Sequence, residues 1–223
     1  MKEGGKLESV WEETKTDLDA VNWKGDTIHL KRIPAIKNKK TGRVYVYPSE
    51  VAKAEIKMLA EQFALEPGDI PLLLMLFAKP GPFKEGYVQY KYKINKMLFY
   101  QWKGMQKQGL GEAFPHDEFE AAPNGPVPKN LGDDLKRLEE KGIVSLSYKK
   151  WGKGPKEASL ATRLTPSGVE IATKLASQVP EPLKEVTVEV KKQLFPLDPL
   201  TIREKVHKEF PEYQKTYVQL DRD

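Results

Sequence analysis

The stretch that decides the fold runs from residue 123 to residue 168 and reads PNGPVPKNLGDDLKRLEEKGIVSLSYKKWGKGPKEASLATRLTPSG. Leu131, Leu135 and Leu138 recur at i, i+4 and i+7, which is the spacing of one apolar helix face. A helix is therefore predicted over residues 126–141. Prolines in its first turn are compatible with this prediction, because the first helical positions need no backbone donor.

After Gly142 the hydrophobic period changes from the helical value to two. Residues 143–148 and 158–164 alternate as paired strands do, and a turn-rich segment joins them. A second helix is predicted from Pro166, with Thr165 as its cap. Helix, hairpin and helix in this order are typical of the second half of a winged helix. The predicted fold is thus an α+β protein with a winged helix-turn-helix core.

Four motifs accompany this pattern: F-E-A-A-P-N-G-P at 119–126, L-x-x-D-L-x-x-L-x-x-K-G-I at 131–143, L-T-x-x-G at 164–168, and K-I-N-K-M-L-F at 93–99. Together they resemble the YwgA-like and Panacea (SocA-like antitoxin) group, over residues 68–213. Asn124 stands where that group usually has an aromatic residue, and Asn95 replaces its usual glutamine. The resemblance implies a winged-helix fold and a role as regulator or antitoxin, and it implies no catalytic residue.

The remaining elements are predicted from local periodicity and from turn residues. An N-terminal β-hairpin is predicted over residues 27–34 and 43–47, after a first segment, 1–22, that is expected to be a short helix or a frayed tail. Further helices are predicted over residues 50–65 with Ser49 as cap, and over 71–79, 92–107, 183–194 and 200–210, the last with Asp198 as cap. This organisation predicts an N-terminal extension with the β-hairpin (1–48), a winged-helix domain (49–178) and a C-terminal helical tail (179–223).

Composition limits the classes of function. The chain has 37 Lys and Arg residues against 32 Asp and Glu residues, a net charge of +5 that permits an anionic partner without requiring one. It has no cysteine, which excludes disulfides, thiolate metal sites and cysteine nucleophiles and favours a reducing compartment. Its longest apolar run, residues 70–78, is too short to span a bilayer, and no signal-peptide core follows Met1. A cytoplasmic protein with no membrane partner is predicted.

The predicted hairpin tip gathers lysines around one aromatic residue. Basic side chains on such a tip suit contacts with phosphates, and an exposed ring suits a sugar or a base. The alternative is a solvated turn with the tryptophan folded back onto the core. The predicted contacts to double-stranded DNA are made by the hairpin residues Lys149, Lys150, Trp151, Lys153 and Lys156, and by Lys129 and Asn130 at the start of the preceding helix.

That preceding helix argues against a simple repressor. From Lys129 to Lys141 four basic residues face four acidic ones, so its net charge is zero. Two hypotheses therefore stand: a DNA-binding transcriptional regulator, and a protein-interaction module of antitoxin or adaptor type that does not bind DNA directly. The sequence leaves the oligomeric state, the operator and any small-molecule effector open.

A second basic group lies in the N-terminal hairpin and comprises Lys31, Arg32, Lys37, Lys39, Lys40 and Arg43. It is expected to be a mobile, solvated turn that contributes less to DNA binding than the hairpin at 143–164, because ordering a mobile loop costs entropy.

An enzyme is not predicted. His29, His116 and His207 are far apart in the sequence and none has the spacing of a metal ligand pair, and neither a phosphate-binding loop nor a nucleophile elbow is present. Glu189-Val190-Lys191 echoes an E-x-K nuclease element, but its local period is helical. No cofactor and no metal are implied.

Overall fold

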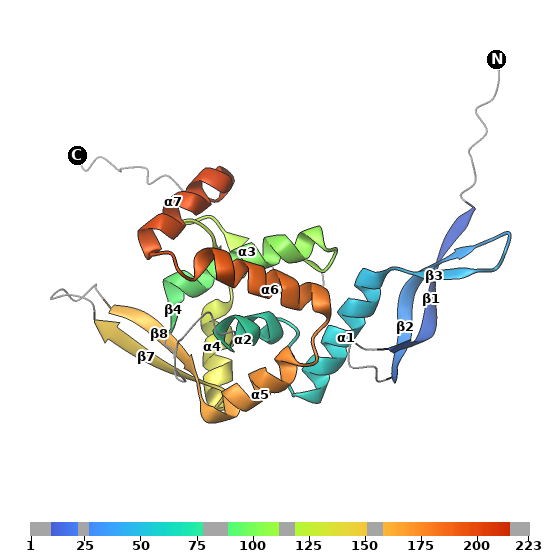
Figure 1. Ribbon diagram of the computed structural model, residues 1–223, viewed down its shortest axis with the longest axis horizontal. Coiled ribbons are helices and arrows are strands. Elements are labelled where there is room, and N and C mark those ends of the chain that lie inside the picture. Colours follow the sequence, from blue (N-terminus) through green and yellow to red (C-terminus); the bar gives the residue numbers. More distant parts are fainter. Residues whose placement is uncertain (1–9, 22–26, 78–88, 112–118, 151–157, 215–223) are drawn as a thin grey trace, which may run out of the picture.

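A computed structural model describes residues 10–21, 27–77, 89–111, 119–150 and 158–214 of the 223-residue chain. It has a mixed α+β structure (Figure 1). The helices are α1 (Pro48–Gln62), α2 (Asp69–Phe77), α3 (Lys91–Lys107), α4 (Leu131–Glu140), α5 (Pro166–Ala176), α6 (Glu181–Leu194) and α7 (Pro199–Glu209), followed by a 3-10 turn at Pro211–Tyr213. The strands are β1 (Trp11–Val21), β2 (Thr27–Asn38), β3 (Val44–Val46), β4 (Gln89–Tyr90), β5 (Phe119–Glu120), β6 (Val127–Pro128), β7 (Val144–Lys150) and β8 (Ala158–Leu164).

Helix α2 lies at the centre of the helical body. Its residues 69–76 are all buried, which follows from a sequence that is apolar on every side of the helix. Helices α1, α3, α5 and α6 pack against it. Helix α6 shares this core, because its Leu183 is fully buried in the same apolar cluster as α2. Among the described residues, no helix is both long and apolar enough to cross a membrane.

The predicted helix over residues 126–141 begins later than its leucine pattern indicated. Val127 and Pro128 form strand β6, which pairs with β5, and α4 starts only at Leu131. Proline disfavours the helical conformation of the residue before it, so Pro128 holds Val127 extended. The rest of the prediction is confirmed: Leu131, Leu135 and Leu138 are buried, and Gly142 closes the helix at a φ of 70°.

The hairpin and the helix after it agree with the prediction. Strands β7 and β8 pair antiparallel from Val144 opposite Leu164 to Lys150 opposite Ala158. The short strand β4 adds to the other side of β8, so the strand order of this sheet is β4-β8-β7. Thr165 caps α5 by accepting a hydrogen bond from the backbone N–H of Gly168.

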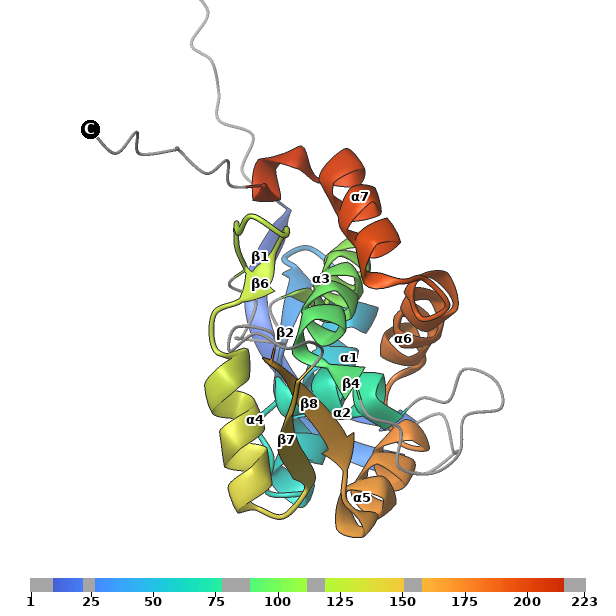
Figure 2. The same ribbon diagram turned by 90° about the vertical axis from the view of Figure 1, so that its left-hand side faces the viewer.

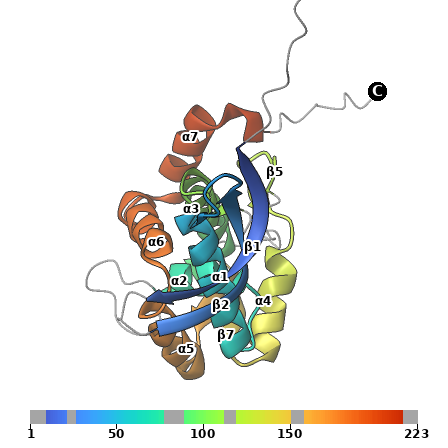
Figure 3. The same ribbon diagram turned by 90° about the vertical axis from the view of Figure 1, so that its right-hand side faces the viewer.

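The N-terminal segment forms a sheet rather than the hairpin alone. Strand β1 occupies residues 11–21, where a short helix or a tail was expected, and it pairs with β2 (Figure 3). Strand β2 pairs in turn with β3 (Figure 1). The sequence of β1, WEETKTDLDAV, has no continuous apolar face, so its strand character depends on pairing with β2. Residues 1–9 lie outside the described part of the chain.

A β-bulge interrupts the pairing of β1 with β2. The register shifts between Thr16 and Leu18, and Arg32 adopts a φ of 56° with its N–H donating to Asp17 Oδ1 at 2.8 Å. Bulges of this kind increase the local twist and bend the strand.

Two predicted helix caps had different outcomes. Asp198 caps α7 by accepting from the N–H groups of Leu200 and Thr201, as expected. Ser49 does not cap α1: the helix already starts at Pro48, and Tyr47 occupies the cap position without a side-chain hydrogen bond. Proline suits the first helical position, which moves the start of the helix ahead of the serine.

Candidate nucleic-acid interface

Helix α4 is held against the body by a partly buried ion cluster around the fully buried Asp69. Arg137 Nη2 donates to Asp69 Oδ1 at 2.6 Å and lies 3.2 Å from Asp134 Oδ1, while Arg137 Nη1 lies 3.0 Å from Glu66 Oε1. Asp69 is completely buried at the start of α2, and its second oxygen accepts from the N–H of Glu66. A planar guanidinium can reach several carboxylates at once, so Arg137 fixes both the position and the rotation of α4.

The outward face of α4 is acidic once internal contacts are counted. Arg137 is used in the ion cluster, and Lys141 Nζ donates to the carbonyl of Ala64 at 2.6 Å. Glu139 Oε1 accepts from the N–H of Leu146, which ties the last turn of α4 to β7. The exposed charged side chains from Leu131 to Glu140 are Asp133, Lys136, Glu139 and Glu140. Within the helix, three exposed carboxylates against one exposed lysine oppose the approach of this face to phosphates, although the charge of the exposed Lys141 remains just after the last turn.

Lys129 and Asn130 are exposed immediately before α4, where a nucleic-acid contact was predicted. The carbonyl of Asn130 accepts the N–H groups of Asp133 and Asp134, each at 3.0 Å, and its side chain makes no capping hydrogen bond. The first turn of α4 therefore presents Lys129 and Asn130 together with the carboxylate of Asp133.

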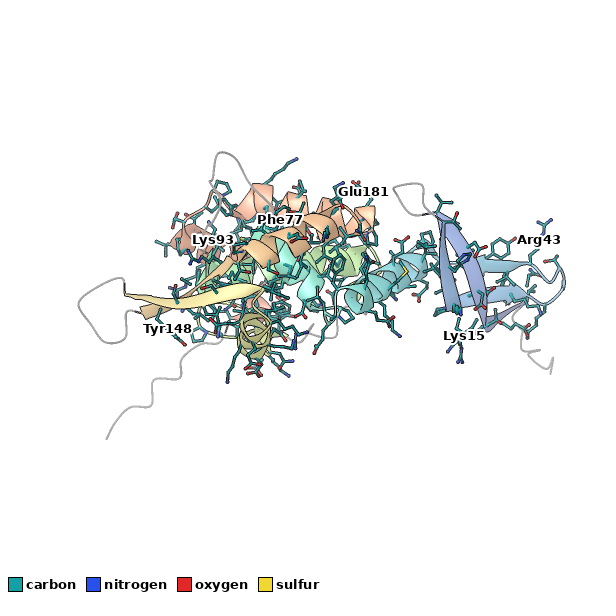
Figure 4. All side chains as sticks on the ribbon, turned by 90° about the horizontal axis from the view of Figure 1, so that it is seen from below. Lys15, Arg43, Phe77, Lys93, Tyr148 and Glu181 are labelled. Carbon is teal, nitrogen blue, oxygen red and sulfur yellow. The ribbon has the colours of Figure 1, made fainter. Side chains whose placement is uncertain are left out.

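The hairpin β7–β8 extends away from the helical body (Figures 1 and 4). Tyr148 is 78% exposed. Lys149 and Lys150 end β7, and their backbone pairs with Ser159 and Ala158. The other predicted hairpin contacts, Trp151, Lys153 and Lys156, lie outside the described residues.

Helix α4 ends at the turn that contains Gly142, and β7 follows this turn and lies beside α4 (Figure 2). Arg163 on β8 is exposed, opposite Ser145 in the register, and adds a cation that the sequence reasoning did not single out. The alternation of β8 in the sequence could have identified Arg163, because successive residues of a strand face opposite sides and the preceding Thr162 is buried.

The base of the hairpin is fixed by a very close approach to α5. Thr165 Oγ1 donates to the carbonyl of Gly142 at 2.6 Å, and the N–H of Thr165 donates to the carbonyl of Ile143 at 3.0 Å. A Cβ atom at Gly168 would lie 2.0 Å from the oxygen of Ile143, so only glycine fits there. The L-T-x-x-G motif thus sets how the hairpin leaves the body.

A buried lysine holds the segment that leads into α4. Lys96 of α3 is 1% exposed, and its Nζ donates to the carbonyl of Pro126 at 2.7 Å. Burial lowers the pKa of Lys96 to about 8. Gly125 has a φ of 87°, and a Cβ atom there would lie 2.9 Å from Val206 Cγ1. The K-I-N-K and N-G-P motifs are therefore in contact, which sequence reasoning did not predict because it assigned Lys96 no role.

Several buried polar atoms in this region of the structure make no hydrogen bond. The buried polar atoms without a hydrogen-bond partner in the described structure include Tyr92 Oη, Asn95 Oδ1 and His207 Nε2. Burial and the charges of Arg203 and Lys96 lower the pKa of His207, so the imidazole is biased to its neutral form.

The basic group of the N-terminal sheet lies at the other end of the molecule from the hairpin, as the positions of Arg43 and Tyr148 show in Figure 4. Its turn is ordered by hydrogen bonds. Asn38 Oδ1 accepts the N–H groups of Lys40 and Thr41, and the N–H of Gly42 donates to the carbonyl of Asn38. The turn that the sequence predicted to be mobile is thus held by three hydrogen bonds in the structure.

The described residues contain no group of three His, Asp or Glu side chains that could hold a metal ion. His29 contacts Asp19 on the N-terminal sheet and His207 lies on α7, while His116 is outside the described ranges.

Comparison with known proteins finds no matching family model and no matching curated protein.

Proposed function

We propose that the chain is a winged-helix protein of the YwgA-like and Panacea type that binds double-stranded DNA as a transcriptional regulator. The element order supports this proposal: α2, β4, α3 and α4 are followed by β7, β8 and α5, with β4 and β7 on either side of β8. In a winged helix the corresponding elements are helices, a short strand, a recognition helix and the two strands of the wing.

The observation that carries the proposal is the hairpin. It projects from the body, exposes Tyr148, and carries Lys149 and Lys150 into a segment whose sequence adds Lys153 and Lys156. Phosphate contacts from such a projection provide affinity and position, independent of base sequence.

The charges on α4 shape the proposed mode of binding. Its exposed carboxylates oppose insertion of the helix along its length into a groove. In the proposed mode the hairpin leads, and only the first turn of α4, with Lys129 and Asn130, approaches the duplex.

The test is a fluorescence-anisotropy titration of a labelled random-sequence duplex at several salt concentrations. Replacement of Lys149, Lys150, Lys153 and Lys156 by alanine should weaken binding and reduce the slope of log K against log salt by about 0.9 for each lost phosphate contact. The corresponding variant of Lys37, Lys39 and Lys40 should change the duplex slope less. Unchanged duplex binding by the hairpin variant would remove the basis of the proposal.

A matched pair of single changes tests the orientation of α4. Asp133 lies in its first turn and Glu140 in its last, and both are exposed. Asp133→Asn should strengthen duplex binding because it removes a carboxylate near the DNA, while Glu140→Gln should leave it unchanged. Equal gains from the two changes would instead place the whole helix along the duplex.

The second candidate is a protein-interaction module of antitoxin or adaptor type, and the acidic outward face of α4 favours it. No binding to duplex at low salt, together with capture of a protein partner that Lys136→Glu or Glu140→Lys abolishes, would favour this candidate over DNA binding.

A further inference from the structure

The N-terminal sheet has one face turned towards the helical body and one outward face that carries aromatic rings. Leu30, Ile33 and Ala35 are buried, and β2 packs against α1 on their side of the sheet. Ala35 pairs with Val46, and the neighbouring pair, Ile36 with Tyr45, belongs to the other face because successive residues of a strand alternate. Tyr45 is 47% exposed on this outward face.

Trp11 joins Tyr45 there. The two rings meet edge to face with their centroids 5.2 Å apart, and Trp11 is 40% exposed. We call Trp11, Ile36 and Tyr45 the aromatic face. Tyr47, 55% exposed, follows two residues after Tyr45 at the start of α1. A track of three rings therefore runs along this side of the sheet.

An open groove of about 650 Å³ continues this track towards α1. Pro34 and Ile36 of the outward face provide apolar lining and Tyr47 provides a ring, while Ala35 of the buried face borders the groove. Of its charged lining residues, Glu50 is paired with Lys53 at 2.7 Å, while Lys15 and Glu13 are exposed. Glu13 stands in the same row as Ile36 and Tyr45, so it is the carboxylate closest in register to the aromatic face.

Cations lie at the end of the track. Residues 38–43, which we call the basic turn, connect β2 to β3 and include Lys39, Lys40 and Arg43, all exposed. The N–H of Lys39 donates to the carbonyl of Val10, next to Trp11, which attaches the turn to the aromatic face. Because hydrogen bonds already hold this backbone, its cations can contact an anion without the cost of ordering a loop.

We propose that the aromatic face and the basic turn bind single-stranded DNA, at a surface separate from the hairpin β7–β8 and independent of the function proposed above. Flat rings stack on unpaired bases, whose faces a duplex hides, and neighbouring cations follow the phosphates. The backbone of the turn is held in place by two of its own side chains: Asn38 accepts from Lys40 and Thr41, and Thr41 accepts from Arg43. RNA offers the same unpaired bases and phosphates together with a 2′-hydroxyl group, so the test below compares the two kinds of strand.

The test uses the full chain and a labelled oligothymidine, followed by fluorescence anisotropy. Tyr45→Leu should weaken binding about fivefold or more, which is the lower end of the contribution of one stacked base. Tyr45→Phe keeps the ring and should bind as the unchanged protein does. Arg43→Ala should also weaken binding and reduce its salt dependence, whereas Glu13→Gln should strengthen it.

Tyr148→Leu is the matched control, because this tyrosine is more exposed and lies on the hairpin at the other end of the molecule. It should leave oligothymidine binding unchanged. Circular dichroism of each variant shows that the sheet is retained, and the opposite signs expected for Glu13→Gln and Arg43→Ala cannot both result from unfolding. Equal loss in Tyr45→Leu and Tyr148→Leu, no binding of oligothymidine at low salt, or tighter binding of oligouridine than of oligothymidine would each overturn the proposal.

Discussion

At the scale of single residues, several residues of the four sequence motifs are explained by close contacts between segments that are distant in the sequence. Gly168 allows α5 to touch the carbonyl of Ile143, and Gly125 allows the segment before α4 to reach Val206. Lys96 satisfies the carbonyl of Pro126 from inside the core. Neighbouring atoms in the structure explain each of these residue types, so these motif residues have a structural role whatever the function of the protein.

Gly168 gives a test in which the usual preference is reversed. Alanine normally stabilises a helix relative to glycine, but at Gly168 its Cβ would meet backbone at 2.0 Å. Gly168→Ala should lower the free energy of unfolding by about 1–3 kcal/mol or more, which is the usual cost of overpacking a core.

The matched control is Gly132→Ala in α4, where the nearest atom to an added Cβ is Lys91 Nζ at 3.8 Å. This change should raise the free energy of unfolding by about 0.4–1 kcal/mol. Urea denaturation of both variants measures the difference. If Gly168→Ala is as stable as the unchanged protein, the close approach of α5 to Ile143 is not present in solution.

The sequence could not reveal the partners of these residues. Lys96 lies two residues after the buried Ile94 in α3, and the lysines of a helix are normally expected at the surface. Its burial depends on Pro126, which is thirty positions away. Likewise, the exposed rings of Trp11 and Tyr45 meet only because β1 and β3 flank the same strand.

At the scale of elements, the local sequence pattern predicted the secondary structure correctly where an element has an apolar face that packs in the core. It failed where the secondary structure depends on pairing with another strand. The leucines of α4 and the alternation in β7 predicted a helix and a strand, and both are confirmed. Strand β1 has no strongly apolar face, so a helix or a tail was the wrong expectation. The five residues before α4 contain two prolines, which disfavour the helical conformation of the residues before them. This effect outweighed the apolar spacing that predicted a helix from residue 126.

The position of α4 depends on Arg137, and its removal should be costly. Arg137→Ala would leave the fully buried Asp69 without its cation, and the loss of one partner of a buried ion pair typically costs about 3–5 kcal/mol. Arg137→Lys should recover only part of this loss, because an ammonium cannot reproduce the fork that reaches three carboxylates.

Lys136→Ala is the neighbouring control, since Lys136 is exposed, and it should change the free energy of unfolding by no more than about 0.5 kcal/mol. Chemical denaturation followed by circular dichroism compares the three variants. A loss below about 1 kcal/mol for Arg137→Ala would show that apolar packing alone holds α4, and that the ion cluster only accompanies it.

At the scale of the whole molecule, the two projecting β structures stand at opposite ends with the helical body between them (Figure 4). The helical body contains one large apolar cluster that joins α1, α2, α3, α4, α5 and α6. This arrangement separates the proposed duplex surface from the proposed single-strand surface. At physiological ionic strength, charges separated by more than about 8 Å of solvent are largely screened from one another, so DNA at one end should have little effect on the other.

Both proposals together therefore predict that one molecule binds a duplex and an oligothymidine at the same time. The affinity for labelled oligothymidine should change by less than about twofold when an unlabelled duplex saturates the protein, because changes at distant sites without shared partners usually act independently. Sedimentation of the mixture should show one complex that contains the protein and both nucleic acids. Tyr45→Leu should remove only the oligothymidine from this complex, and the hairpin variant of Lys149, Lys150, Lys153 and Lys156 should remove only the duplex. Displacement of oligothymidine by the duplex at a one-to-one ratio would mean that both nucleic acids use the same surface, and the single-variant losses would then identify which end of the molecule it is.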